Sequence, residues 1–233
     1  MVFSVIQPAY FPAISVIGKL LTADKIIWSD SFTFNKHSEI NRTKIKTITG
    51  SKWLTIPVFS GGPTGKTIQH IQIDNHENWA KNHRRSIHLN YKNTAYYYYY
   101  CDDLDLLLQK QWNYLIDILL ASLELIINKM RIKTHIKKSS ELPVITDRSE
   151  RVITWANFLN CESYLIQDFE KELINIKKIK RAGINVINYK LDKIEYFQQY
   201  EEFIYPLSIL DILFNEGDVA SRLIKEHILL KQV

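Results

Sequence analysis

Residues 2–30 read VFSVIQPAYFPAISVIGKLLTADKIIWSD, and their pattern predicts the fold class of the chain. An apolar, β-prone run over residues 3–6 ends at Gln7-Pro8, a pattern that predicts a buried strand entering a loop. Between residues 13 and 23 apolar side chains recur at three- and four-residue steps, which predicts a helix, and residues 25–29 predict a second strand. A strand, a helix and a second strand in this order indicate a parallel sheet.

The same alternation returns toward the C-terminal end of the chain. Periodicity and turn residues there predict strands over 163–166 and 184–189 and helices over 149–159, 169–182, 206–214 and 218–226. Between the two ends we predict strands over 53–59 and 69–73, helices over 77–90 and 103–130, and an exposed connection over 133–142. We therefore expect a three-layer α/β fold, with a mostly parallel sheet covered by helices and a long helix in the middle of the chain. We expect a single domain over residues 1–233, with a helical excursion over 103–142.

Composition is that of an ordinary globular protein. The chain has 233 residues, of which 46% are hydrophobic and 24% charged, so it can bury a core without disulfides. Cys101 and Cys161 lie far apart and in no ligand spacing, which predicts reduced thiols and no metal site. No apolar run is long enough to cross a bilayer, and we expect a cytoplasmic protein. The net charge of +5 permits attraction to phosphate groups, while cofactors and oligomeric state stay open.

Polar side chains follow the first two predicted strands. Gln7 and Tyr10 lie in the loop before the first helix, where backbone N–H groups and side-chain donors can converge on an anion. Asp30 follows the second strand, and ligands of parallel sheets bind outside the carboxyl ends of the strands. We therefore expect Gln7 and Asp30 to share one crevice. The structural alternatives are that Tyr10 covers the core and that Asp30 caps a helix or forms an ion pair.

A basic segment comes next, on residues expected to form a loop. Lys36, Arg42 and Lys44 can give charge-assisted hydrogen bonds to a phosphate or a carboxylate, and Arg42 can bind bidentately. Asn41 can orient the same ligand. We expect Arg42 to face a pocket that it shares with Gln7, whereas the alternative is a solvated basic loop.

His83 is the best candidate for a general base. It lies four residues after Trp79, so both side chains share one face of the predicted helix. Asp30 is the second candidate for proton transfer. A packing role for His83 is the structural alternative. Ser208 and Asp211 have the spacing of a helix start, for which capping is the simpler interpretation.

Short motifs along the chain resemble the WbqC-like family in their order and spacing. Gln7-Pro8, Tyr10 and Pro12 match the family's N-terminal signature, and residues 53–58 (WLTIPV) follow at the family's spacing. The remaining matches are Asp24, Asp30, Phe34, Lys36, Asn41-Arg42, Lys44-Ile45, Ile68, Ile71, Ile73, Trp79, His83, Tyr91, Ala95-Tyr96, Tyr196-Phe197-Gln198, Phe203 and residues 207–217 (LSILDILFNEG). Together these residues extend the resemblance over nearly the whole chain.

The resemblance implies a bacterial protein of surface-polysaccharide (O-antigen-type) biosynthesis. The implied activity is that of a transferase that binds a phosphate-bearing or nucleotide-linked amino sugar, with acyl or aminoacyl transfer as the candidate reaction. Lys36, Arg42 and Lys44 would then neutralise phosphate, and Gln7 and Asn41 would orient the ligand.

Departures from the family pattern keep other functions open. Ile6 stands where the family usually has a histidine, Thr33 where it usually has a glutamine, and Ser31 where it usually has a second acidic residue. A noncatalytic partner or regulator of the same pathway is therefore an alternative. A nucleic-acid-binding module is another, favoured by the basic balance and the aromatic residues, although no RRM, KH or helix-turn-helix signature is present. The sequence likewise lacks the nucleophile elbow, dinucleotide loop, P-loop and zinc-protease motifs of common enzyme classes.

Overall fold

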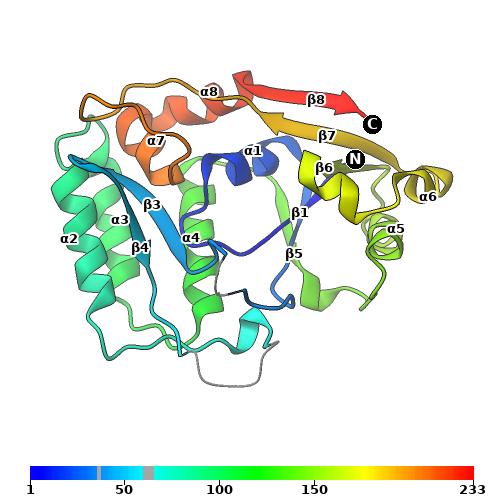
Figure 1. Cartoon of the computed structure of the whole chain (residues 1–233), viewed down its shortest axis with the longest axis horizontal. Helices are drawn as coiled ribbons and strands as arrows, with labels where there is room; N and C mark the ends of the chain where they lie inside the picture. Colours follow the sequence, from blue (N-terminus) through cyan, green and yellow to red (C-terminus); the bar gives the residue numbers. More distant parts are fainter. Residues whose placement is uncertain (36–37, 60–65) are drawn as a thin grey trace.

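A six-stranded sheet forms the centre of the molecule in the computed structural model, which describes residues 1–35, 38–59 and 66–233 (Figure 1). Its strand order is β5-β2-β1-β6-β7-β8. The strands are β1 Val2–Ile6, β2 Lys25–Trp28, β5 His135–Lys138, β6 Ser163–Ile166, β7 Asn185–Leu191 and β8 Ile228–Gln232. Neighbours pair in parallel except β7 and β8, which are antiparallel. The expected mostly parallel sheet is confirmed.

Helices cover both faces of this sheet, because successive strand residues point to opposite sides and each side carries apolar residues. One face buries Phe3, Ile27, Tyr164 and Val186 against α5 (Arg148–Leu159) and α6 (Ile176–Arg181). The other face buries Ile6, Ile26, Leu165 and Tyr189 in a cluster with α1 (Ile14–Thr22) and α8 (Ala220–Glu226). These three layers are the architecture that the alternating sequence pattern predicts.

The second cluster continues into a group of helices beside the sheet, at the left of Figure 1. These are α2 (Trp79–Tyr91), α3 (Tyr97–Gln109), α4 (Leu115–Lys129) and α7 (Ile209–Glu216). The long helix expected over 103–130 is divided, because residues 110–114 leave the helical path. Asn113 accepts a hydrogen bond from the Ile73 N–H at 2.9 Å, and the Trp112 indole donates to the Leu107 carbonyl at 2.9 Å. The longer part, α4, lies in the middle of the chain as expected.

An antiparallel hairpin of β3 (Arg42–Thr47) and β4 (Gly50–Thr55) lies apart from the main sheet. Two predictions are corrected here. The basic loop around Arg42 and Lys44 is a strand, and the strand expected over 53–59 ends at Thr55 and pairs with β3 alone. Arg42 and Lys44 are two residues apart, which is the period of one strand face.

Other expected elements differ in detail. Residues 69–73 were expected to form a strand, but Ile68–His70 is a short 3-10 helix, and the expected connection over 133–142 contains β5. The helix expected over 169–182 is a 3-10 turn, Asp168–Leu173, followed by α6, because Asn175 breaks the helix and caps the next one. Ser208 caps α7 by accepting from the Leu210 N–H at 3.3 Å, as expected. Among the described helices, none combines the length and the apolar composition that a membrane span requires.

Candidate functional site

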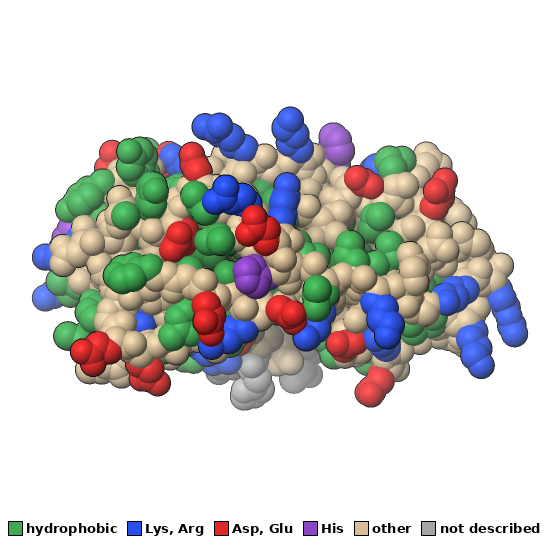
Figure 2. All heavy atoms as spheres, turned by 90° about the horizontal axis from the view of Figure 1, so that it is seen from above, with side chains coloured by type: hydrophobic (Ala, Val, Ile, Leu, Met, Phe, Trp, Pro, Cys, Tyr) green, Lys and Arg blue, Asp and Glu red, His purple; other side chains and the backbone are tan. Residues whose placement is uncertain are grey.

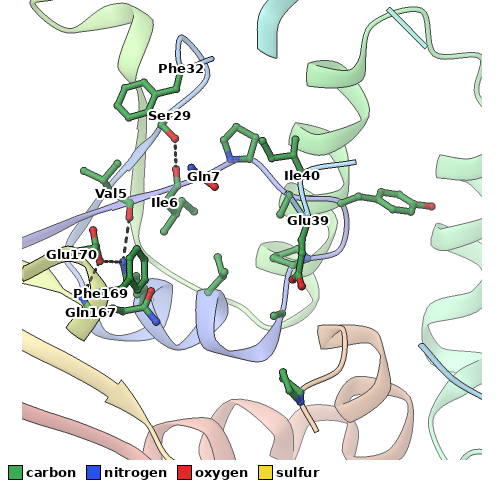
Figure 3. A pocket seen from close by; sticks show the side chains of 18 of the residues that line it. Val5, Ile6, Gln7, Ser29, Phe32, Glu39, Ile40, Gln167, Phe169 and Glu170 are labelled. Atoms are coloured by element: carbon green, nitrogen blue, oxygen red, sulfur yellow. Dashed lines mark hydrogen bonds and ion pairs between the residues drawn. The ribbon is translucent and has the colours of Figure 1, made fainter. Parts of the chain in front are cut away.

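A cavity of about 530 Å³ opens at the carboxyl ends of β1 and β6 (Figure 3). From β1 the chain continues to β2 on one side, whereas β6 lies on the other side of β1, so the strand order reverses between these two strands. Parallel α/β sheets bind ligands at such a point, because the loops that leave the two strands diverge. Gln7 after β1 and Gln167 after β6 both line the cavity.

The loop after β1 forms one side of the cavity, and hydrogen bonds to residues near the hairpin and near the start of α7 fix its conformation. The backbone of Phe11 has a φ of 40°, which is unfavourable for a bulky side chain. Its carbonyl accepts hydrogen bonds from the hydroxyls of Thr43 at 2.8 Å and Ser208 at 3.0 Å. Tyr10 donates its N–H to the Ile40 carbonyl at 3.0 Å. The loop is therefore fixed by β3 and by the start of α7.

The hairpin supplies a basic wall, defined here as Arg42, Lys44 and Trp53. Lys44 is paired with Trp53 across the two strands, so both side chains lie on one face. The Arg42 guanidinium lies 4.5 Å and the Lys44 ammonium 5.0 Å from the centre of the Trp53 ring. All three line the cavity, and Lys44 forms no ion pair with a carboxylate of the described residues. This wall can hold an anion beside an aromatic surface.

Helix α5 and Phe32, which follows β2, form a second basic wall, called the α5 wall and defined here as Arg148, Arg151, Phe32 and Trp155. The Arg151 guanidinium lies 4.8 Å from the ring centre of Phe32 and 5.5 Å from that of Trp155. Arg148 precedes it by three residues, at the first residue of α5, and is exposed. All four side chains line the cavity.

A buried ion pair lies at the base of the cavity. Lys19 of α1, only 4% exposed, donates to the Glu170 carboxylate at 2.8 Å and to the Val5 carbonyl at 3.4 Å. Glu170 also accepts from the Gln167 N–H at 2.8 Å, which fixes the loop after β6. Lys19 and Glu170 neutralise each other. The net charge of the cavity therefore comes from the two basic walls and from the exposed carboxylate of Glu39.

Four of the predicted binding residues line this cavity: Gln7, Tyr10, Arg42 and Lys44. Lys36 lies outside the described residues. Asn41 is buried and its amide donates to the Ile56 carbonyl at 2.8 Å, so it fastens the hairpin to the following segment. The expected crevice shared by Gln7 and Asp30 is not formed, since Asp30 is not among the residues that line the cavity.

Asp30 instead anchors the ends of two strands. Its carboxylate accepts from the Ser140 N–H at 2.9 Å, the Ser140 hydroxyl at 2.6 Å, the Ser139 hydroxyl at 2.9 Å and the Gln69 amide at 2.7 Å. Burial alone would raise its pKa, but these hydrogen bonds outweigh burial and hold the pKa below its ordinary value. The contacts give Asp30 a structural role, and its role in proton transfer stays a prediction.

His83 lies behind the cavity, on the far side of Tyr10. Its Nδ1 is 3.2 Å from the Tyr10 hydroxyl, and its ring packs edge-on against Trp79, 5.3 Å between centres. Burial lowers the pKa of His83 to about 4, partly opposed by a hydrogen bond to the Thr55 backbone, while the positive charge of Lys52 lowers it further. A neutral imidazole can accept the Tyr10 proton in this hydrogen bond. His83 does not line the cavity, and its catalytic role also stays a prediction.

Sequence reasoning missed the basic wall on α5. Arg148, Arg151 and Trp155 follow one another at three- and four-residue steps, which places them on one face of a helix. That pattern was available, but nothing local in the sequence places this face beside the end of β1. Among the described residues no group of three or more potential metal ligands is present.

Comparisons with known proteins identify the family of this chain. The family model described as "WbqC-like protein family" matches residues 7–223. The uncharacterized protein Rv1507c of Mycobacterium tuberculosis is 26% identical over 219 residues, which cover 93% of this chain and 94% of that protein. No solved structure matches significantly. Since the family model spans the β1 loop, both basic walls and α7, the chain belongs to the WbqC-like protein family.

Proposed function

We propose that the cavity binds a phosphate-bearing sugar, specifically a nucleotide-linked amino sugar. Membership of the WbqC-like family suggests a role related to polysaccharide biosynthesis, in which such compounds are substrates. The observation that supports the proposal most is the hairpin wall, which brings Arg42 and Lys44 into a cavity beside the ring of Trp53. Cations bind the phosphates there, and the indole offers a surface on which a planar base or a sugar ring can pack.

Two polar side chains of the cavity, Glu39 and Gln7, suit the sugar. Glu39 is exposed in the cavity close to the hairpin, and Gln7 lies across from it in the close-up of Figure 3. A carboxylate can accept from an ammonium group or a hydroxyl, and an amide can both donate and accept. Glu39 and Gln7 therefore supply the groups that an amino sugar needs beside its phosphates.

Acyl or aminoacyl transfer is the reaction that we propose for the bound amine. The amine nitrogen would form a bond to the acyl carbon, and the leaving group of the activated donor would depart with the electrons of the broken bond. The proton lost by the amine needs a base in the cavity. Glu39 fits that role better than His83 or Asp30, because Glu39 lines the cavity and the other two do not.

The nucleic-acid alternative has less support. Binding to a duplex or a single strand requires a basic stripe that follows the phosphate backbone. On the face seen in Figure 2, acidic and basic side chains are interspersed among hydrophobic ones over the part of the surface that the structure describes. The cations of the two basic walls instead line a cavity of about 530 Å³, a size suited to a small ligand.

Calorimetric titration with UDP-N-acetylglucosamine and UDP-glucosamine tests the proposal. We expect wild type to bind at least one of them, and Arg42→Ala and Lys44→Ala each to weaken binding roughly tenfold, since a charge-assisted hydrogen bond is worth about 1.5–3 kcal/mol. Arg85→Ala, which removes an exposed arginine of α2 outside the cavity, is the matched control and should bind like wild type. If wild type shows no binding to any member of a broad panel of phosphorylated sugars, the proposal is refuted.

A further inference from the structure

The α5 wall places two arginines, Arg148 and Arg151, three residues apart on one helix. Neither Arg148 nor Arg151 forms an ion pair with a carboxylate of the described residues. Arg84 shows what a structural arginine of this protein looks like, because its guanidinium binds Asp105 through two hydrogen bonds of 2.9 and 2.7 Å. Unlike Arg84, the two α5 arginines are not neutralised by a carboxylate of the described residues, and they can therefore bind an anion.

Arg151 is held in a place that is unfavourable for an isolated charge. Burial lowers the pKa of Arg151, and the positive charge of Arg148 lowers it further, although Tyr164 and Asp147 oppose this. One of its N–H groups donates to the Ile145 carbonyl at 3.4 Å, which leaves the other donors of the guanidinium. A bound anion would remove the repulsion between the two arginines and take up these donors.

The aromatic rings beside Arg151 restrict how an anion can reach it. The Phe32 and Trp155 rings are stacked at 6.5 Å between centres, and the guanidinium lies near both. When a guanidinium packs against an aromatic ring, its N–H groups still point outward in the guanidinium plane. Two of these N–H groups can bind the two oxygens of a carboxylate. Arg148 lines the same part of the cavity and adds a second positive charge, so the α5 wall is suited to one compact oxyanion.

The size of the cavity indicates that both walls face one ligand. About 530 Å³ holds one compound of the size of a nucleotide sugar. In Figure 3, Glu39 and Ile40 of the hairpin side lie across the cavity from Phe32 and Phe169. A single ligand that fills the cavity would therefore meet Arg42 and Lys44 at one end and Arg148 and Arg151 at the other.

We infer that the substrate is a nucleotide-linked acidic sugar, whose phosphates bind at Arg42 and Lys44 and whose ring carboxylate binds at Arg148 and Arg151. This inference rests on the proposed function and narrows its substrate class. In the proposed function the phosphates bind at the hairpin wall, so the α5 wall must bind a second anionic group of the same ligand. On a sugar ring this group is a carboxylate. Arg148 and Arg151 thereby distinguish an acidic sugar from a neutral one.

UDP-glucose and UDP-glucuronic acid test the inference, because they differ only in a hydroxymethyl group that is replaced by a carboxylate. In calorimetric titrations we expect wild type to bind UDP-glucuronic acid roughly tenfold or more tightly than UDP-glucose. Arg151→Met and Arg148→Ala should each reduce this ratio to below about threefold, with the affinity for UDP-glucose unchanged. Arg148 is exposed, so its removal preserves the fold even if Arg151→Met does not.

The outcomes separate this inference from the proposed function. Equal affinity of wild type for the two compounds overturns the inference and leaves the nucleotide-sugar proposal intact. Loss of affinity for both compounds in Arg148→Ala also overturns it, since the wall would then bind phosphate. If neither compound binds and the amino-sugar compounds fail as well, the proposed function is wrong and the inference with it.

Discussion

Protonation of His83 should destabilise the folded protein at acidic pH. Burial lowers the pKa of His83 from 6.5 to about 4. As pH falls below 6.5, the unfolded chain binds a proton that the folded chain does not, so the free energy of unfolding decreases until pH reaches about 4. A pKa difference of about 2.5 corresponds to roughly 3 kcal/mol of stability, which is present above pH 6.5 and is lost by pH 4.

Urea denaturation followed by tryptophan fluorescence at pH values from 7.5 to 4.5 measures this loss. His83→Gln keeps a group that can meet the Tyr10 hydroxyl but cannot titrate, so its stability should fall less steeply with decreasing pH than that of wild type. His135→Gln, at an exposed position of β5, is the matched control and should retain the wild-type slope. Parallel slopes for wild type and His83→Gln would refute the assignment of a buried neutral imidazole behind the cavity.

Three further substitutions test contacts that hold the site together. Tyr91→Phe removes a 2.7 Å hydrogen bond to the buried Asp211 carboxylate and should lower the free energy of unfolding by about 1–3 kcal/mol in urea, whereas no loss would show that this bond is unimportant. Gly18→Ala places a methyl group 1.9 Å from the Tyr189 hydroxyl and should cost about 1–3 kcal/mol, with Tyr189→Phe in the same chain recovering part of it; an unchanged melting temperature would contradict the packing. Asp30→Ala should destabilise the protein by at least about 2 kcal/mol but leave nucleotide-sugar affinity unchanged in the folded fraction, and a selective loss of affinity would instead place Asp30 in the binding site.

Local patterns were sufficient to predict β1, β2, β6 and β7 of the main sheet, but not its edge strands β5 and β8 or the hairpin. β1, α1 and β2 were predicted because a short apolar run and a helical period decide each of them within a few residues. β3 has the sequence RTKIKT, in which cations alternate with Thr and Ile, and its charges led us to expect a loop. The alternation itself is typical of a strand with one polar face. β8 lies at the sheet edge and is mostly exposed, and its sequence ILLKQ shows no alternation of apolar and polar residues, so it was missed.

The position of the candidate site followed from the end of a strand. Gln7 and Tyr10 line the cavity because the loop after β1 leaves the carboxyl end of a parallel strand, and their role in binding stays a prediction. The helical face shared by His83 and Trp79 was also expected, but the partner of His83 is Tyr10, 73 residues away, and no local pattern indicates that contact. Arg151 belongs to the cavity through the packing of α5 against the sheet, which depends on the whole fold.

In the proposed complex the cavity binds a nucleotide-linked sugar, with the phosphates at Arg42 and Lys44 of the hairpin and the sugar beside Gln7 of the β1 loop. A crystal structure of the protein soaked with a nucleotide sugar tests it most directly. We predict ligand density in the cavity, with phosphate oxygens within hydrogen-bond distance of Arg42 or Lys44 and a ring of the ligand against Trp53. A ligand bound elsewhere on the molecule, with the cavity filled only by solvent at saturating concentration, would contradict the claim.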